Sequence, residues 1–344
     1  YYLINSLDEI DKWIEEAEEV GEVAVDTETT SLDPHQADLV GISLCSKIGK
    51  ACYIPVGHKS PKCLKKDAVI KKLKKILEDP SIKKIGQNIK FDFIVFYKCG
   101  ITLSSMEDTM LMSYVLDAGK NRHNMDTLSE IHLGHKTISF KEMVGTGKKE
   151  INFSEVELDK AKDYAAEDAD VTFRLYKKFI KNLKSEKMIN IYEIFEKPLI
   201  KILAFMEIEG VEIDSKFLKS LSSKFEKKIQ KLEKEVFKIS KKEFNIASPK
   251  QLGEIIYNDL KIAGLKKTKK GSFATSASVL EDLAFKGHEF PKLILDWRQV
   301  SKLKNTYSDA LPEHLNPNTK RVHTSFLLAA TTTGRLASSD PNLQ

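Results

Sequence analysis

Three short acidic stretches contain the residues of this chain that are best suited to chemistry. They are residues 25–29 (Val-Asp-Thr-Glu-Thr), 88–92 (Asn-Ile-Lys-Phe-Asp) and 164–168 (Tyr-Ala-Ala-Glu-Asp). Carboxylates crowded into one pocket repel one another and raise each other's pKa, and a divalent cation removes that cost. Hard oxygen ligands are those that Mg²⁺ and Mn²⁺ prefer. The three stretches together therefore indicate metal-assisted hydrolysis of phosphodiester bonds.

The spacing inside these stretches brings polar groups side by side. Alternate residues of a strand share a face, so Asp26 and Glu28 point the same way at the end of an apolar run. On a helix, Tyr164 and Asp168 are four residues apart and lie on one face. Asp92 follows close to a predicted helix start. Two acids at such spacing are common on surfaces, and the signal comes from the combination of all three stretches.

The three acidic stretches lie on a predicted strand, near a helix start and on a helix, so both kinds of element must position their side chains. Apolar runs predict strands at 22–28, 39–45, 51–56 and 82–86. Helical spacing predicts helices at 67–78, 91–98, 107–117, 124–132 and 154–183. Such a mixture is typical of an α/β domain. Beyond about residue 190 the pattern becomes mainly helical, with an amphipathic lysine-rich helix at 216–242, another helix at 292–308 and an apolar strand at 322–330.

Composition limits the class of protein. The chain has 344 residues, a net charge of +5 and 41% hydrophobic residues, which fits two domains plus a fragment. It contains no apolar run long enough to span a bilayer and no signal sequence, and its first residue is not Met, so we expect a piece of a longer polypeptide. The four cysteines lack paired or zinc-binding spacing, and we expect reduced thiols inside the cell.

Residues 1–190 resemble the 3′-5′ proofreading exonuclease domain of family A DNA polymerases, the bacterial DNA polymerase I type. The matching stretches are 25–29, 86–92, 124–128, 135–140 and 164–171. The resemblance implies an α/β ribonuclease-H-like fold, a mixed sheet flanked by helices, and hydrolysis at single-stranded DNA 3′ ends with two Mg²⁺ or Mn²⁺ ions. Some bacterial relatives have lost the acids and do not proofread. This chain keeps every one, which implies a working exonuclease.

The resemblance also assigns roles to single residues. Asp26 would bridge both metal ions, Glu28 and Asp168 would complete the tighter metal site, and Asp92 would help to hold the second ion. Tyr164, together with Glu28, would orient the attacking water. A tyrosine has an ordinary pKa of about 10, so we do not expect it to be the base.

Four further residues match positions near the DNA strand. Leu32 and Phe140 match positions that pack against the terminal base, for which ordinary core packing is the alternative. Gln87 and Asn88 match positions near the bound strand.

Three acids beside the third stretch, Asp163, Glu167 and Asp170, point around the predicted helix, and we expect them on a solvated face.

From about residue 195 the chain resembles the mainly helical thumb of the same polymerases. The most specific stretch is 245–252, which includes Lys250 as a predicted DNA contact. The lysines of 216–242 and of a basic loop at 266–272 suit phosphate contacts, although a charge run alone is more often a solvated face.

Residues 321–344 resemble the opening of the palm, in which Arg335, Asn342 and Gln344 match positions near the primer-template and the nascent pair. In that family the palm acids that bind the polymerase metals lie further on. We therefore expect these 344 residues not to polymerise and the parent protein to be a DNA polymerase of replication and repair.

The sequence thus predicts an exonuclease domain at 1–190, a thumb at 191–320 and the start of a palm at 321–344. We expect a monomer that binds DNA and no membrane, in the bacterial cytoplasm near the nucleoid or in an organelle. Two alternatives remain open, an RNA exonuclease of the ribonuclease-D type and a non-catalytic DNA-binding scaffold. The palm-like segment argues against the first alternative, and the complete set of acids argues against the second.

Overall fold

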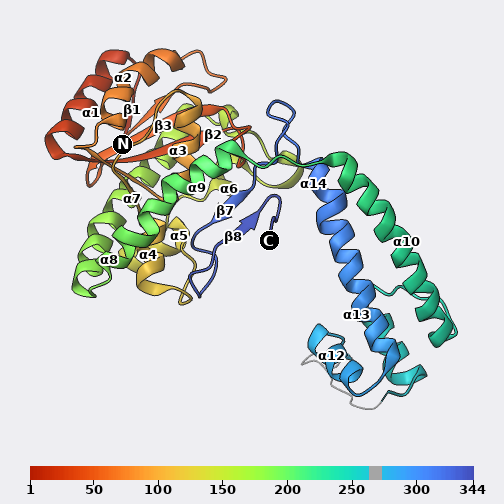
Figure 1. The fold of residues 1–344 in the computed structure, drawn as a ribbon. Helices are drawn as coiled ribbons and strands as arrows, with labels where there is room; N and C mark the ends of the chain where they lie inside the picture. Colours follow the sequence, from red (N-terminus) through yellow and green to blue (C-terminus); the bar gives the residue numbers. More distant parts are fainter. Residues whose placement is uncertain (263–272) are drawn as a thin grey trace. The chain divides into compact units, whose positions relative to one another are not determined.

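The chain forms two compact units in the computed structural model, which describes residues 1–262 and 273–344. Unit 1 consists of Tyr1–Glu209 and Ser325–Ser339, and unit 2 of Gly210–Thr324 and Asp340–Gln344 (Figure 1). The predicted basic loop at 266–272 lies outside the described residues. Among the residues described, no helix combines the length and the apolar composition that a bilayer crossing requires.

Unit 1 is built on a mixed sheet that, in the described part of the chain, has six strands in the order β1-β4-β3-β2-β5-β6. The strands are β1 (Tyr2–Leu3), β2 (Glu22–Thr29), β3 (Leu39–Lys47), β4 (Lys50–Pro55), β5 (Lys83–Gly86) and β6 (Met106–Asp108). Strand β2 pairs antiparallel with β3 and parallel with β5, and so lies inside the sheet. All residues of β3 except the last are buried, because helices cover both faces of the sheet.

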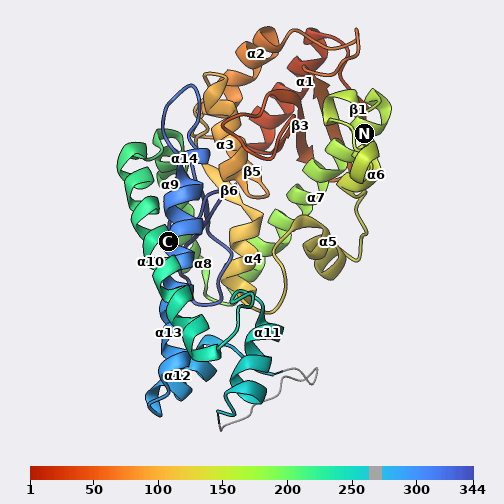
Figure 2. The same ribbon diagram turned by 90° about the vertical axis from the view of Figure 1, so that its right-hand side faces the viewer.

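Helices surround this sheet and supply one side of the site. They are α1 (Leu7–Val20), α2 (Lys66–Glu78), α3 (Ile89–Lys98), α4 (Thr109–Asp117), α5 (Met125–Leu133), α6 (Phe140–Val144), α7 (Leu158–Ser185), α8 (Ile189–Ile191) and α9 (Lys197–Glu209), with the short 3-10 helices η1 (Gly147–Lys149) and η2 (Phe153–Glu155) and the π-helical segment η3 (Tyr192–Glu196). The long helix α7, labelled in Figure 2, packs along β2, β3 and β4. Helix α9 packs against α3.

Most predicted elements of unit 1 are confirmed within a few residues, but α1, β1 and β6 are absent from the prediction. Strands of two or three residues are too short to show a period of two. Helix α1 does carry a helical pattern, since Ile10, Trp13 and Ala17 are its buried apolar residues and lie three and four apart.

The predicted solvated face of α7 is wrong for two of its three acids. Glu167 is buried and accepts a hydrogen bond from the N–H of Ile138 (2.7 Å). Asp170 is fully buried and accepts one from the N–H of Gly49 (2.8 Å). Only Asp163 is exposed, as predicted. The other two acids are buried because α7 is covered by the sheet and by loops from distant parts of the chain.

A two-stranded hairpin near the end of the chain belongs to unit 1 and not to unit 2. It consists of β7 (Ser325–Leu327) and β8 (Ala337–Ser339). The strand predicted at 322–330 is shorter because β8 pairs with three of its residues only. Glu207 on α9 accepts a hydrogen bond from the N–H of Phe326 (2.6 Å), and the Tyr114 hydroxyl donates to the carbonyl of Thr331 (2.8 Å).

Unit 2 is mainly helical, as predicted. Its elements are α10 (Ser215–Ser240), α11 (Pro249–Glu254), α12 (Ala277–Phe285), α13 (Glu289–Lys302) and α14 (Ala310–Glu313), with the π-helical segments η4 (Ile255–Asp259) and η5 (Leu303–Asp309). Helix α10 lies alongside α13 and η5. Helices α10 and α13 run in opposite directions (Figure 1). Ile229 and Leu232 of α10 and Val300 of α13 pack together between them, which confirms the apolar stripe predicted for 216–242.

The buried ion pair between Lys90 on α3 and Glu207 on α9 yields a stability prediction. The two side chains are 6% and 1% exposed. Glu207→Leu should lower the free energy of unfolding by about 3–5 kcal/mol, because it leaves the Lys90 ammonium buried without a counter-charge. The double variant Lys90→Met/Glu207→Leu should recover part of this loss in chemical denaturation. Equal losses in the single and double variants would show that the unpaired charge is not the cause.

Candidate active site

Strand β2 and helix α7 bring three carboxylates together in unit 1. The side-chain oxygens of Asp26, Glu28 and Asp168 all lie within 4.8 Å of one another. Asp26 and Glu28 share one face of β2, as their spacing predicts, and Asp168 reaches them because α7 packs along this strand. In residues 1–262 and 273–344 no second group of three or more potential metal ligands is this close.

The fourth predicted acid, Asp92, lies beside this group but is not part of it. Asp92 is buried in the first turn of α3, and its Oδ1 accepts hydrogen bonds from the N–H (3.0 Å) and the hydroxyl (2.5 Å) of Thr27. The negative charge of Asp26 contributes to the raised pKa of Asp92, so the two carboxylates are neighbours. Thr27 therefore ties α3 to the acidic end of β2.

The electrostatics of the site favour a bound cation. Burial raises the pKa of Asp26 to about 6. Burial, and after it the charges of neighbouring carboxylates, raises the pKa of Glu28, Asp92 and Asp168 well above the usual range. A divalent ion would offset this repulsion, and a set of carboxylate oxygens with no soft ligand fits Mg²⁺ or Mn²⁺. The residues present therefore fit the metal ions that the sequence predicts.

Tyr164 lies one turn before Asp168 on α7, as predicted. Its phenol lies close enough to the carboxylate of Asp168 for each group to affect the pKa of the other. Burial, followed by the charges of Asp168 and Glu28, raises the pKa of the phenol far above its usual range. Tyr164 therefore stays protonated at neutral pH and can hold a water molecule, but it cannot serve as the base.

A cavity of about 620 Å³ opens beside the carboxylates and has an apolar side. Leu32 and Phe140 both line it and are 91% and 42% exposed, which excludes the core-packing alternative. Phe140 stacks on Phe153 with ring centroids 6.1 Å apart and an angle of 9°. The cavity thus offers flat apolar surfaces close to the acids, and the contact of Leu32 and Phe140 with a base stays a prediction.

Of the two polar residues predicted near the DNA strand, Gln87 and Asn88, only Gln87 lines the cavity. Gln87 lines the cavity, and its amide is held by the carbonyl of His123 (2.7 Å) and the hydroxyl of Thr109 (2.5 Å). Asn88 precedes α3 with a positive φ of 60° and is not among the residues that line the cavity.

The cavity also has lining residues that the sequence analysis does not single out. Phe91 and Met125 lie inside stretches that carry the resemblance, and Phe153 comes just before a predicted helix. An apolar residue in such a stretch is a weak signal, because core residues look the same.

The remaining predicted DNA contacts are exposed and lie on other elements. Lys250 is on α11 of unit 2, and Asn342 and Gln344 are in the last residues of the same unit. Arg335 is in unit 1, in the loop between β7 and β8. Their accessibility is compatible with DNA binding, and their contacts stay predictions.

Comparison with known families matches both parts of the chain. Residues 1–184 match the 3′-5′ exonuclease family, and residues 215–344 match DNA polymerase family A. These families generally depend on divalent metal ions. The polymerase match favours the main hypothesis over a ribonuclease-D-type enzyme and over a non-catalytic scaffold.

Curated relatives agree with these matches. DNA polymerase I of Rhizobium leguminosarum is 46% identical, with 100% of this chain and 36% of the relative covered. DNA polymerase I of Pseudomonas aeruginosa is 43% identical, with 97% of this chain and 37% of the relative covered. The chain thus spans little more than a third of the length of these relatives.

A solved structure confirms the predicted fold class, a ribonuclease-H-like α/β part followed by a mainly helical part. It is described as the POL domain of Pol1 from M. smegmatis in complex with DNA primer-template and dNTP, and its TM-score is 0.80 at 24% identity, over 100% of this chain and 55% of that one. The exonuclease match covers 184 of the 344 residues here. The chain therefore belongs to the 3′-5′ exonuclease family that is found in family A DNA polymerases.

Proposed function

We propose that unit 1 hydrolyses phosphodiester bonds at the 3′ ends of single-stranded DNA and releases mononucleotides. The observation that carries this proposal is the group of Asp26, Glu28 and Asp168, whose oxygens lie within 4.8 Å of one another beside an open cavity. Because the chain spans only part of its relatives, the activity of the whole protein belongs to the same proposal. That activity is template-directed DNA polymerisation in replication and repair, with this site as its proofreader.

The carboxylates would bind the metal ions, and Tyr164 would orient the attacking water molecule. Asp26, Glu28 and Asp168 would bind one Mg²⁺ or Mn²⁺ ion, and Asp92 with Asp26 would contribute to a second. Such ions, when bound, lower the pKa of water and neutralise charge on the phosphate and the leaving 3′ oxygen. The protonated Tyr164, with Glu28, would orient the attacking water, since a phenol can donate one hydrogen bond and accept another.

The apolar side of the cavity would bind the terminal base. Stacking of a base on an exposed side chain is tolerant of sequence, which suits an enzyme that must remove any nucleotide. Leu32 and Phe140 offer such surfaces next to the acids. Gln87 and Asn88 would contact the DNA strand whose terminal base lies against Leu32 and Phe140.

DNA binding by the rest of the chain follows from its family and its charge. We propose that the lysines of α10 and the exposed Lys250 contact the duplex phosphates, with Arg335, Asn342 and Gln344 near the primer-template. We further propose a cytoplasmic monomer with an exonuclease domain (1–190), a thumb (191–320) and the start of a palm (321–344).

The activity of the site is tested by Asp26→Ala. This change should abolish Mg²⁺- or Mn²⁺-dependent release of mononucleotides from a labelled single-stranded DNA and leave duplex binding nearly unchanged. Asp163→Ala is the matched control, because Asp163 is an exposed acid on the same helix as Asp168 and should keep the wild-type rate. A full rate in Asp26→Ala would refute the assignment of the metal site, and faster cleavage of RNA than of DNA would favour the ribonuclease alternative.

The stability of the metal-free protein should depend on pH through Asp26. Its folded-state pKa of about 6 is above its ordinary value, so the folded state holds this proton more tightly than the unfolded state does. Stability should therefore fall as pH rises from about 4 to above 6. Asp26→Asn should flatten this fall and raise the Tm at pH 7.5 without metal.

Mg²⁺ should raise the Tm of the wild type at pH 7.5 and have little effect on Asp26→Asn, because a ligand stabilises the state that binds it. Thermal unfolding with and without EDTA measures both effects. An equal Mg²⁺ response in the two proteins would contradict a metal site at Asp26.

Leu32→Ala tests the proposed base contact without disturbing the core. Leu32 is 91% exposed, so the substitution should change the Tm very little. We expect a loss of up to about 2 kcal/mol in the interaction with the terminal base, because the substitution removes the apolar surface of Leu32 that the base would cover. The loss would be visible as weaker binding of a single-stranded DNA to the site. Phe285→Ala in unit 2 is the control, since Phe285 is 95% exposed and lies outside the cavity's lining. Unchanged binding by Leu32→Ala would remove this residue from the site.

A further inference from the structure

Asp108 is a fully buried acid that lies outside the three acidic stretches, at the end of β6. Its carboxylate accepts hydrogen bonds from the first turns of two different helices. Oδ1 accepts from the N–H of Met110 (2.9 Å) in α4, for which Asp108 is the N-cap. Oδ1 also accepts from the N–H of Asn88 (3.1 Å), and Oδ2 from the N–H of Ile89 (3.1 Å), where α3 begins. One side chain thus fixes the start of both helices.

The start of α3 matters because this helix carries Asp92 in its first turn. The first N–H groups of a helix have no partner inside the helix and need an outside acceptor. Asp108 supplies that acceptor for Asn88 and Ile89. Asp92 in turn accepts hydrogen bonds from the N–H (3.0 Å) and the hydroxyl (2.5 Å) of Thr27, the residue that follows Asp26 in β2, so a fixed start of α3 keeps Asp92 beside Asp26.

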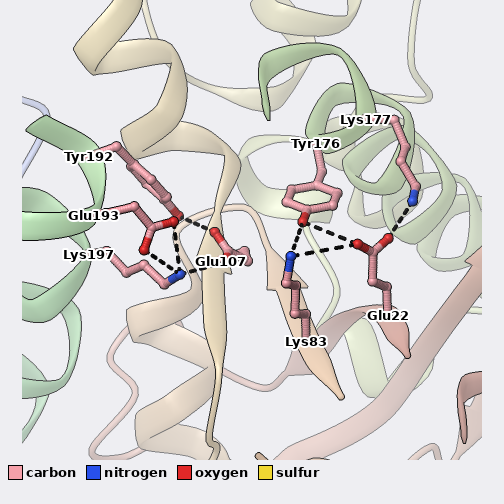
Figure 3. A network of polar contacts seen from close by, with 8 residues as sticks. All are labelled: Glu22, Lys83, Glu107, Tyr176, Lys177, Tyr192, Glu193 and Lys197. Atoms are coloured by element: carbon pink, nitrogen blue, oxygen red, sulfur yellow. Dashed lines mark hydrogen bonds and ion pairs between the residues drawn. The ribbon is translucent and has the colours of Figure 1, made fainter. Parts of the chain in front are cut away.

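The backbone of Asp108 is itself fixed from the other side by a polar network, part of which Figure 3 shows. The N–H of Asp108 donates to the Tyr192 hydroxyl (2.9 Å), which donates to Glu107 (3.0 Å). Lys197 joins Glu107 (2.6 Å) to Glu193 (3.0 Å) in the same network (Figure 3). Strand β6 is therefore anchored to η3 and α9, and Asp108 cannot shift easily along the sheet.

We infer that Asp108 is a positioning residue of the exonuclease site, whose carboxylate holds the start of α3 so that Asp92 stays beside Asp26. Asp108 reaches neither substrate nor metal itself. The inference rests on the proposed function, because it assigns Asp92 a role in holding the second metal ion. Ligands must be held within about half an ångström of their working position, so a loosened α3 would weaken that ion first.

The variant Asp108→Ser separates this role from ordinary helix capping. Serine is a good N-cap residue, so it keeps the cap of α4, but its single short hydroxyl cannot also serve Asn88 and Ile89. We expect Asp108→Ser to bind the weaker of two Mn²⁺ ions at least tenfold less tightly in titration calorimetry. Its kcat for a short single-stranded DNA should fall at least tenfold with little change in KM.

Glu22→Gln is the matched control. Glu22 lies in the other network of Figure 3, where it pairs with Lys177 and Lys83, at the end of β2 remote from Glu28. This substitution removes ion pairs from the same unit and should lower the Tm without changing Mn²⁺ affinity. An equal loss of Mn²⁺ affinity in Glu22→Gln and Asp108→Ser would mean that any destabilisation of unit 1 produces the effect, and would overturn the inference.

Wild-type Mn²⁺ affinity and kcat in Asp108→Ser would also overturn it, since capping of α4 would then explain Asp108 fully. Failure of the proposed function looks different. A wild-type chain that binds Mn²⁺ but cleaves no DNA refutes the nuclease, while the Mn²⁺ comparison still decides the role of Asp108.

A wild type that binds no Mn²⁺ would overturn the inference, because Asp92 would then hold no second ion for Asp108 to position. If Asp108→Ser does not fold, amide exchange of the wild type tests the contact on which the inference depends. The N–H of Asn88 should exchange slowly because Asp108 accepts it, and fast exchange would contradict the inference.

Discussion

The repulsion among buried carboxylates is the constraint on which unit 1 depends. Burial, and after it the negative charges of Asp26, Asp168 and Asp92, raises the pKa of Glu28. Glu28, Asp92 and Asp168 are buried and Asp26 is half-buried, so water screens these charges poorly. Such a group stays together only if the rest of the fold supplies the free energy. Strand β2 shows how this is done, because Val23, Ala24 and Val25 are completely buried just before the strand reaches its acids. The apolar half of the strand stabilises the position of the charged half.

Other buried acids of the same unit show what a purely structural carboxylate looks like. Asp170 lies on α7 only two residues after Asp168, yet it forms a two-point ion pair with Arg174 (3.1 and 2.6 Å). Glu107 has Lys197. In these cases a protein cation or donor compensates the charge. The charges that act on Asp168 are those of other acids. This difference separates the acids for which we propose a metal ion from acids whose counter-charge the protein itself supplies.

Local patterns made part of this architecture predictable. The period of two in β2 and the spacing of four between Tyr164 and Asp168 depend only on backbone geometry, and both are confirmed. The spacing of Asp170 and Arg174 permits an ion pair on one helix face, but the burial of Asp170 could not be predicted, because the loop residue Gly49 that covers it is 121 residues away in the sequence. The positioning role inferred for Asp108 could not be predicted from the sequence either. It depends on a hydrogen bond from the N–H of Asn88, 20 residues earlier in the chain, and on a strand of only three residues.

The residues that match the polymerase family do not coincide with one compact unit of the structure. The polymerase match begins at residue 215, yet the hairpin of 325–339 clusters with the exonuclease unit. Leu328 of this segment is buried in the core of unit 1. One atom also joins the segment to α3, because Oε1 of Glu207 accepts both the N–H of Phe326 and the ammonium of Lys90. A buried carboxylate that serves two donors cannot lose one without leaving the other less well compensated. The helix that carries Asp92 is therefore coupled energetically to a segment of the polymerase family through a single side chain.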